Sequence, residues 1–348
     1  MVITLEDRLI GAGQPCFIIA EAGVNHNGDP VLAHRLIDVA KAAGADAVKF
    51  QTFKADQLVT LDAPKAEYQL QQTEAGETQY AMLKRLELSA GTFHDLQQHC
   101  HAVCIRFMST PFDEDSADLL SELGVTVFKT PSGEITNLPY LAHVARKERP
   151  MIVSTGMATL GEVEMAVSTI RAAGNQAIVL LQCVSNYPAD PADVNLRAME
   201  TMARAFGVPV GFSDHTAGIE VALAAVALGA CVIEKHFTLD RTMPGPDHAA
   251  SLEPDQLAAM IRGIRNVEAA LGHGRKEPAA RELNTAEVAR KSLVAAHDLK
   301  AGMVLSAGEL AVKRPGTGLP PAMRSYVIGR TLRVDVRAGT LIGLEMLA

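Results

Sequence analysis

Two short polar runs in the sequence each follow an apolar stretch and each end in a histidine. They are Ser213-Asp214-His215 and Glu234-Lys235-His236, and an alanine-rich helical segment separates them. In a chain that repeats strand and helix, both histidines would lie at the carboxyl ends of neighbouring strands. Two imidazoles that leave other positions to water and substrate predict an open metal site, which suits Mn²⁺ or Mg²⁺, or alternatively Co²⁺ or Zn²⁺.

Polar side chains end or closely follow most of the apolar runs. They are Glu21, Lys49, Gln51, Thr110, Lys129, Ser132, Glu134, Ser154, Ser185, Asn186, Tyr187 and Ser213. A single residue of this kind is often only a turn or a helix cap. Two lysines with several hydroxyls and a helix start at Ser154-Thr155-Gly156 instead predict a pocket for the phosphate and the carboxylate of one small ligand.

A rival group, His99-Cys100-His101 with Cys104, also contains metal-binding residue types. It ends the helical pattern before the third apolar run, so it falls on the face away from the carboxyl ends of the strands. We therefore expect a helix end with exposed histidines and buried thiols at this point, rather than a metal site.

Eight apolar runs have the length and composition of buried parallel strands. They are residues 16–20, 45–50, 104–108, 125–129, 151–153, 177–182, 208–212 and 231–234. Helical patterns alternate with them, and a capping box at Thr159 and Glu162 and a glycine at position 44 mark helix ends. This alternation implies a closed parallel barrel or a doubly wound sheet. Even spacing, without a G-x-G-x-x-G fingerprint after the first run, favours a (β/α)8 TIM barrel.

Two regions break this rhythm. The long polar segment 54–87 predicts a functional excursion over the barrel mouth. After an amphipathic helix predicted at 254–271, the chain turns to short strand-like runs with a weak repeat, in which residues 299–305 resemble residues 336–342. We predict a barrel domain over 1–272, a linker over 273–283 and a small β-rich domain over 284–348.

The composition excludes several classes of protein. A formal net charge of −8 without a block of basic residues argues against nucleic-acid binding and against binding to a membrane surface. Neither a signal peptide nor an apolar run of membrane-spanning length is evident, so we expect a cytoplasmic protein. Five cysteines without C-x-x-C spacing indicate buried thiols in a reducing compartment.

Taken together, these residues resemble the sialic acid synthase family, to which legionaminic and pseudaminic acid synthases are close. The resemblance covers almost the whole chain. Its motifs are residues 20–28 (AEAGVNHNG), 48–52 (VKFQT), 109–112 (STPF), 129–134 (KTPSGE), 154–157 (STGM), 211–215 (GFSDH), 234–238 (EKHFT), 245–248 (GPDH) and 312–316 (VKRPG).

The resemblance implies a TIM barrel followed by a small antifreeze-like (SAF) domain. It implies an enzyme that condenses phosphoenolpyruvate with an N-acylated hexosamine, most often N-acetylmannosamine, and with water, to give N-acetylneuraminate and phosphate. His215 and His236 would bind the metal, first of all Mn²⁺, and the metal would hold the aldehyde oxygen of the sugar.

The resemblance also implies the ligand of each side chain. Phosphoenolpyruvate would be held by Lys49, Thr110, Lys129, Ser132, Ser154 and Ser213, with either Ser185 or Asn186 on the phosphate. The sugar would be contacted by Glu21, Gln51, Tyr187 and Asp247. Arg314 would reach its N-acyl group from the partner subunit of a domain-swapped homodimer.

The chemistry agrees with these residue types. A Lewis acid would polarise the aldehyde for attack by the enol carbon, and Glu134 would orient or deprotonate the water that then adds to the carbon bearing the phosphate. The tetrahedral intermediate would expel phosphate by C–O cleavage. The lysines would stay charged, so no Schiff base is needed.

Three alternatives stay open on the sequence alone. A lysine-dependent aldolase would use Lys49, Lys129 or Lys235, and a non-catalytic sugar-binding or ice-binding protein would use the C-terminal domain. Within the family, the acceptor could instead be a 2,4-diacetamido-trideoxy hexose, as in legionaminic acid synthases, or the sugar of a pseudaminic acid synthase. The apolar Ala63-Pro64 and Tyr68 in the long second loop would favour a deoxy sugar.

Overall fold

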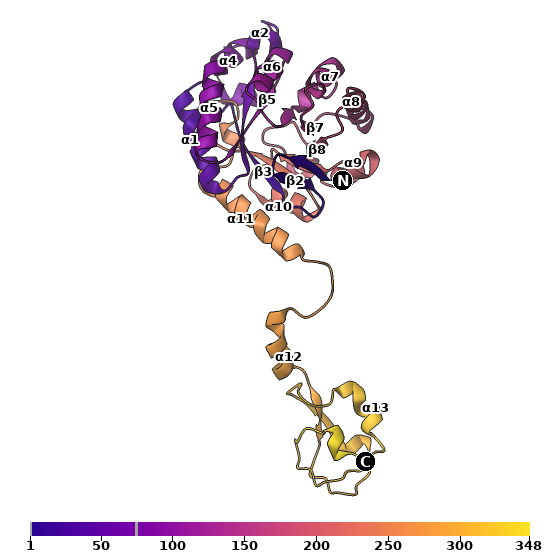
Figure 1. The fold of residues 1–348 in the computed structure, drawn as a ribbon. Helices are drawn as coiled ribbons and strands as arrows, with labels where there is room; N and C mark the ends of the chain where they lie inside the picture. The colour runs from indigo at the N-terminus through magenta and orange to yellow at the C-terminus, as the bar shows by residue number, and fades with distance from the viewer. Residues whose placement is uncertain (1, 74–75) are drawn as a thin grey trace. The chain divides into compact units, whose positions relative to one another are not determined.

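The structure is a computed structural model that describes residues 2–73 and 76–348 (Figure 1). The side chain of Tyr68, which the sequence analysis singled out, lies outside the described part. Contacts divide the chain after Gly272, with a second unit from His273 to Ala348. Each unit is described by itself below.

Within the described residues, the first unit is built on eight parallel strands that form one sheet. They are β3 (Phe17–Gly23), β4 (Ala47–Thr52), β5 (Arg106–Pro111), β6 (Phe128–Thr130), β7 (Met151–Ser154), β8 (Ile178–Cys183), β9 (Val210–Asp214) and β10 (Val232–His236). Their spatial order is β5-β4-β3-β10-β9-β8-β7-β6, and β5 and β6 also lie side by side. The predicted TIM barrel is therefore confirmed, since helices surround this nearly closed sheet (Figure 1).

The helices that cover the sheet begin and end at recognisable signals. They are α1 (Pro30–Ala43), α5 (Ala90–Ala102), α6 (Glu114–Glu122), α7 (Leu138–Ala145), α8 (Leu160–Ala172), α9 (Ala198–Phe206), α10 (Glu220–Ala227) and α11 (Pro254–Leu271). The predicted capping box holds at α8, where the Thr159 hydroxyl accepts from the backbone N of Glu162 and the Glu162 carboxylate accepts from the backbone N of Thr159. Gly44 ends α1 with φ +89°, a left-handed conformation that favours glycine.

Each observed strand ends one to three residues later than the apolar run that predicted it. Glu21 and His236 are inside the ladder, although the predicted runs ended before them, and Lys49 is inside both the predicted run and the observed strand. Cys104 is a correction: it is an exposed residue with φ +58° between α5 and β5, neither a strand residue nor a buried thiol. The other four cysteines are buried.

A β-hairpin of β1 (Val2–Leu5) and β2 (Arg8–Gly11) closes the amino end of the barrel. Its Ile3, Leu5 and Ile10 belong to one buried cluster with inward side chains from the first residues of the strands, such as Phe17 and Val179. The amino end of the barrel is therefore filled, and polar side chains are left to the carboxyl end.

The excursion between β4 and β5 contains three short helices, α2 (Ala55–Leu58), α3 (Glu67–Gln72) and α4 (Gln79–Leu86). The sequence predicted a polar excursion, yet Met82 and Leu86 of α4 are buried with Val24 and Phe53 in a cluster separate from the main core. An amphipathic α4 thus lays an apolar face against the barrel mouth.

The second unit contains α12 (Leu283–Ala289), α13 (Arg324–Val327) and an antiparallel pair, β11 (Ser292–Ala295) with β12 (Leu310–Lys313). The two repeated segments pair with each other, because Leu299 and Val336 exchange two backbone hydrogen bonds of 2.8 and 2.9 Å. The first and last positions of both repeats are buried in one cluster. The unit has a core of its own, as a small domain requires.

Within the described residues, none of the helices combines the length and the apolar character that crossing a membrane requires.

Candidate active site

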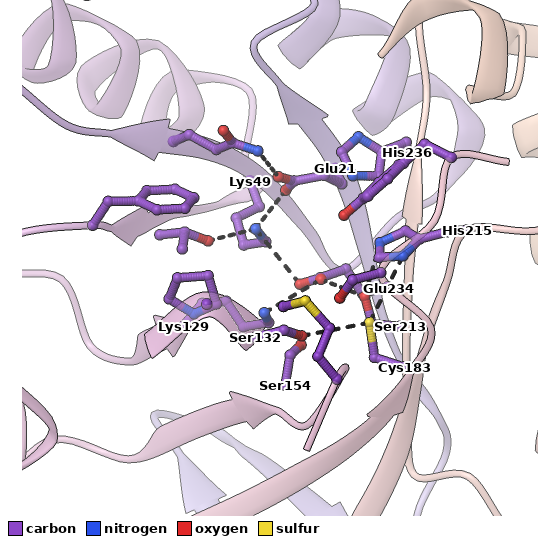
Figure 2. A pocket seen from close by; sticks show the side chains of 18 residues that line it. Glu21, Lys49, Lys129, Ser132, Ser154, Cys183, Ser213, His215, Glu234 and His236 are labelled. Carbon is purple, nitrogen blue, oxygen red and sulfur yellow. Dashed lines mark hydrogen bonds and ion pairs between the residues drawn. The ribbon is translucent and has the colours of Figure 1, made fainter. Parts of the chain in front are cut away.

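A cavity of about 220 Å³ lies at the carboxyl ends of the barrel strands (Figure 2). Each strand of the barrel, or the loop that follows it, contributes at least one side chain to the lining of this cavity. The residues predicted from the sequence that line it are Glu21, Lys49, Gln51, Thr110, Lys129, Ser132, Ser154, Ser185, Tyr187, Ser213, His215 and His236. The structure therefore brings twelve of the predicted site residues around one space.

Four buried charged groups form the floor of this cavity (Figure 2). Lys49 Nζ lies 2.7 Å from Glu21 Oε2 and 3.6 Å from Glu234 Oε2, and it donates to Thr110 Oγ1 at 2.6 Å. Lys129 Nζ lies 3.5 Å from the other oxygen of Glu234. Glu234 therefore bridges the two lysines and holds both ammonium groups toward the cavity.

The net charge of this cluster depends on whether Glu21 is ionised. Burial raises the pKa of Glu21 to about 7, although the nearby Lys49 opposes the shift. Burial acts in the same direction on Glu234, but Lys129 and Lys49 outweigh it and lower its pKa to about 2. When Glu21 is protonated, two lysines face one carboxylate, and the cavity carries the net positive charge that an anionic ligand requires.

Hydroxyl groups and a backbone N–H face the same space from β6, β7 and β8. The backbone N of Gly156 donates to Ser132 Oγ at 3.0 Å, and a Cβ at Gly156 would lie 2.3 Å from Ser185 Oγ. Among the described residues, the buried Ser154 Oγ has no hydrogen-bond partner. These donors, packed around a glycine that leaves room, fit the oxygens of a phosphate or carboxylate.

The two histidines lie next to each other at the end of β9 and β10, with ring centroids 5.5 Å apart. His215 Nδ1 lies 2.7 Å from the backbone oxygen of Val184, and this contact fixes the ring. The other ring nitrogen, Nε2, lies 3.5 Å from Ser213 Oγ, which lines the cavity. His236 Nδ1 is buried without a hydrogen-bond partner in the described part of the chain and lies 4.0 Å from Asp247 Oδ2. Burial, followed by the neighbouring His215, holds the pKa of His236 well below its usual range.

A divalent cation fits this donor set. Two adjacent imidazoles, one of them with an orphaned buried nitrogen, are neutral nitrogen ligands of the kind that such ions take. The described residues contain no group of three or more His, Cys, Asp and Glu side chains arranged to hold a metal. A site made by His215 and His236 would consequently leave most coordination positions to water and to substrate oxygens.

Lys235, one of the three lysines that the aldolase alternative could use, points away from the cavity. Successive residues of a strand face opposite sides, so Glu234 and His236 face the cavity and Lys235 faces outward. Its Nζ donates to Asp214 Oδ2 at 2.9 Å and to the backbone oxygen of Thr216 at 2.5 Å, and both side chains of the ion pair are fully buried. Lys235 therefore ties β10 to the loop that carries His215.

A second cavity of about 310 Å³ adjoins the first, and the two share Gln51, Tyr187 and His236 in their walls. Asp247 and Glu134 line only the second. Glu134 is half-buried and accepts from Asn137 Nδ2 at 2.7 Å, and burial raises its pKa. The remaining wall is mostly apolar and comes from the excursion and from Val24, Phe112, Gly133 and Pro246.

Two predicted residues lie outside both cavities. Asn186 lines neither, whereas its neighbour Ser185 lines the first. Arg314 belongs to the second unit, where its Nε donates to the backbone oxygen of Ala289 at 3.0 Å.

The sequence analysis did not select Glu234 or Cys183 as site residues, although both line the first cavity. Glu234 could have been found from the strand period, because it precedes His236 by two residues and must share its face. Cys183 Sγ lies 3.7 Å from His215 Nδ1, and no sequence pattern marked it.

Comparison with known proteins gives concordant matches for both units. Residues 36–276 match the NeuB family model, and residues 290–348 match the SAF domain. The chain is 51% identical over 95% of its length to N,N'-diacetyllegionaminic acid synthase of Legionella pneumophila, covering 94% of that protein. It is 38% identical over 97% of its length to human N-acetylneuraminate-9-phosphate synthase, covering 94% of that protein.

A solved structure shares the same architecture. The sialic acid synthetase of Leptospira borgpetersenii, solved with citrate, has a TM-score of 0.72 and 38% identity, covering 82% of this chain and 95% of its own.

Proposed function

This chain belongs to the NeuB family of sialic acid and related nonulosonate synthases, and we propose that it condenses phosphoenolpyruvate with an N-acylated aldohexose and water, releasing phosphate. The observation that carries this proposal is the pair of joined cavities. One is cationic and rich in hydroxyl groups, the other is larger and less charged, and two adjacent histidines lie in the wall of the first with His236 common to both.

Phosphoenolpyruvate fits the first cavity by charge. Its phosphate and carboxylate would lie against Lys49 and Lys129, with hydroxyl donors from Ser132, Ser154 and Ser213. Because both lysines are already held by Glu234, little side-chain entropy is lost on binding.

A divalent ion at His215 and His236, with Mn²⁺ as the first candidate and Mg²⁺ or Co²⁺ as alternatives, would supply Lewis-acid polarisation of an aldehyde oxygen. The side chains of the chain itself position the reactants around that point. Gln51 and Tyr187 line both cavities, so they are placed to orient an aldehyde toward the enol carbon of phosphoenolpyruvate.

Glu134 is our candidate for the group that orients and deprotonates water. It stands at the end of the Ser132–Glu134 turn, so one short segment presents both a phosphate ligand and a carboxylate. A carboxyl group with a raised pKa is a better base near neutral pH than an ordinary one. Addition of water to the carbon bearing the phosphate then allows C–O cleavage and leaves a 2-keto acid.

For the acceptor we propose a 2,4-diacetamido-trideoxy hexose, because a relative at 51% identity is named as an N,N'-diacetyllegionaminic acid synthase. N-acetylmannosamine, the first expectation from the sequence, is the second candidate. The more distant N-acetylneuraminate-9-phosphate synthase relative supports only the shared chemistry.

The test is phosphate release from phosphoenolpyruvate by the full-length protein with Mn²⁺ and a panel of these aldehydes. We expect release with at least one acceptor and none without acceptor. With ¹⁸O in the bridging position of phosphoenolpyruvate, C–O cleavage must leave the label in the phosphate. Failure of every acceptor, or label in the sugar acid, would contradict the proposal.

We further propose that the protein acts as a domain-swapped homodimer in the cytoplasm, with Arg314 of one subunit completing the sugar site of the other. In its own unit Arg314 follows β12 in an exposed loop, where Nε donates to the backbone oxygen of Ala289 and the two terminal nitrogens would be left to donate to an amide oxygen.

A further inference from the structure

The second cavity has a wall that the proposed reaction does not explain. Of the side chains that α4 contributes to it, Met82, Leu83 and Leu86 are apolar and Gln79 is polar. Leu58 and Phe53 continue the apolar surface, and most of these residues belong to a hydrophobic cluster distinct from the barrel core. Gln69 of α3 and Gln79 are the polar side chains of this wall, and the apolar side chains outnumber them.

The two cavities fix which end of an acceptor meets this wall. The aldehyde carbon must lie beside phosphoenolpyruvate in the first cavity, so the remote end of the sugar extends into the second. Gln51, Glu134 and Asp247 can satisfy the polar groups near the junction. The sixth carbon of the sugar would then lie against the side chains of the excursion.

We propose that Leu58 and Leu83 make this protein selective for an acceptor whose sixth carbon is a methyl group rather than a hydroxymethyl group, an inference that rests on the proposed function. A methyl group gains from burial against leucine. A hydroxyl group buried there would lose its bonds to water without gaining a partner. A single group in an apolar pocket discriminates by about 10- to 200-fold.

The experiment compares two pairs of aldehydes with the full-length protein, phosphoenolpyruvate and Mn²⁺. One pair is N-acetylmannosamine and its 6-deoxy analogue; the other is 2,4-diacetamido-2,4-dideoxymannose and its 6-deoxy analogue. Within each pair the sugars differ by one oxygen atom, so the ratio of their kcat/KM values isolates the selectivity at the sixth carbon. We expect the 6-deoxy sugar to be preferred about tenfold or more.

Leu83→Asn should reduce that preference about tenfold by giving the hydroxyl a partner. Leu83 and Leu58 are only partly buried, so Leu58→Asn serves as a second variant if Leu83→Asn does not fold. Leu70→Asn is the matched control, because Leu70 is an exposed helical residue of the same excursion and does not line the cavity.

The possible outcomes separate the inference from the function. Equal rates within each pair, a preference for the hydroxymethyl sugars, or an unchanged ratio in both cavity variants would overturn the inference and leave the synthase activity standing. Absence of phosphate release with all four sugars would overturn both.

Discussion

The site depends on polar residues that are buried at the ends of strands, and several of them are held by a specific partner. Lys49 and Lys129 would be costly to bury alone, but Glu234 lies between them. His215 is fixed by the carbonyl of Val184, whereas His236 Nδ1 has no hydrogen-bond partner among the residues that the structure describes. Side chains that are held before the ligand arrives lose little freedom on binding.

His236→Ala tests the metal ligands directly. We expect its affinity for Mn²⁺, measured from the free-ion signal by electron paramagnetic resonance, to fall by at least about 100-fold, because half of the protein donor set is lost. Chelation should abolish phosphate release by the wild-type protein, and added Mn²⁺ should restore it. His99→Ala, at the rival cluster of the sequence analysis, is the control and should bind Mn²⁺ as the wild type does.

His26 provides a prediction on pH. Its ring is fully buried in the loop after β3, where burial, followed by the nearby His248, lowers its pKa to about 4. The unfolded chain would take up a proton near pH 6.5, before the folded protein does, so folding stability is fully present above that pH and falls between pH 6.5 and 4.

Urea unfolding followed by circular dichroism at pH 7 and pH 5 measures this effect. Between about pH 7 and pH 5, the free energy of unfolding of the wild type should fall by about 2 kcal/mol because of His26. The His26→Gln variant lacks this contribution, so its free energy of unfolding should fall about 2 kcal/mol less over the same range. An identical pH dependence of the two proteins would show that His26 does not titrate as its burial requires.

At the scale of elements, most of the barrel could be predicted because its sequence is locally consistent. The helix over Pro254–Leu271 begins and ends as its apolar stripe indicated, and the eight apolar runs correspond to the eight strands of the sheet. The strand ends were placed too early, since a lysine or glutamate inside a ladder is recognisable only when its partner on another strand is known. The hairpin of β1 and β2 and the apolar face of α4 were missed for the same reason: short elements take their stability from packing rather than from local pattern.

The loop before α1 supports α4, and this contact can be tested. Gly28 has φ +79°, and a Cβ there would lie 2.5 Å from the backbone oxygen of Arg85 in α4. Gly28→Ala should displace α4 and raise the KM for the acceptor by about tenfold or more, while the KM for phosphoenolpyruvate stays unchanged.

Gly124→Ala is the control for backbone strain in that experiment. Gly124 has φ +77°, but a Cβ there meets nothing within 4 Å. Both variants should lose about 1–2 kcal/mol of stability from the left-handed conformation. Equal acceptor KM values in the two variants would mean that the contact with α4 does not matter.

At the scale of the whole molecule, the two units have separate hydrophobic cores. The cluster that contains Leu299 and Val336 includes no residue of the barrel. A fragment ending at Gly272 should therefore fold and bind phosphoenolpyruvate, but it should lose turnover because it lacks Arg314. Calorimetric titration and phosphate release measure the two properties separately.

Mixing two variants tests whether Arg314 acts across subunits. Arg314→Ala should lower kcat/KM for the acceptor by about 10- to 100-fold, the loss expected for a charged hydrogen bond, and Lys313→Ala should not. Mixed with inactive His236→Ala protein, Arg314→Ala should regain activity, since a hybrid dimer contains one intact site. No gain on mixing would mean that Arg314 does not serve the partner.

The hairpin that closes the amino end of the barrel also affects the order in which substrates bind and products leave. With that end filled by Ile3, Leu5 and Ile10, we expect reactants to enter and leave at the carboxyl end of the barrel. Lys49 and Glu234 stand two residues deeper along their strands than Gln51 and His236, so the proposed site for phosphoenolpyruvate would lie beneath the proposed position of the sugar. What binds deepest must enter first and leave last, and phosphoenolpyruvate should therefore precede the sugar in a compulsory order, with phosphate as the final product to depart.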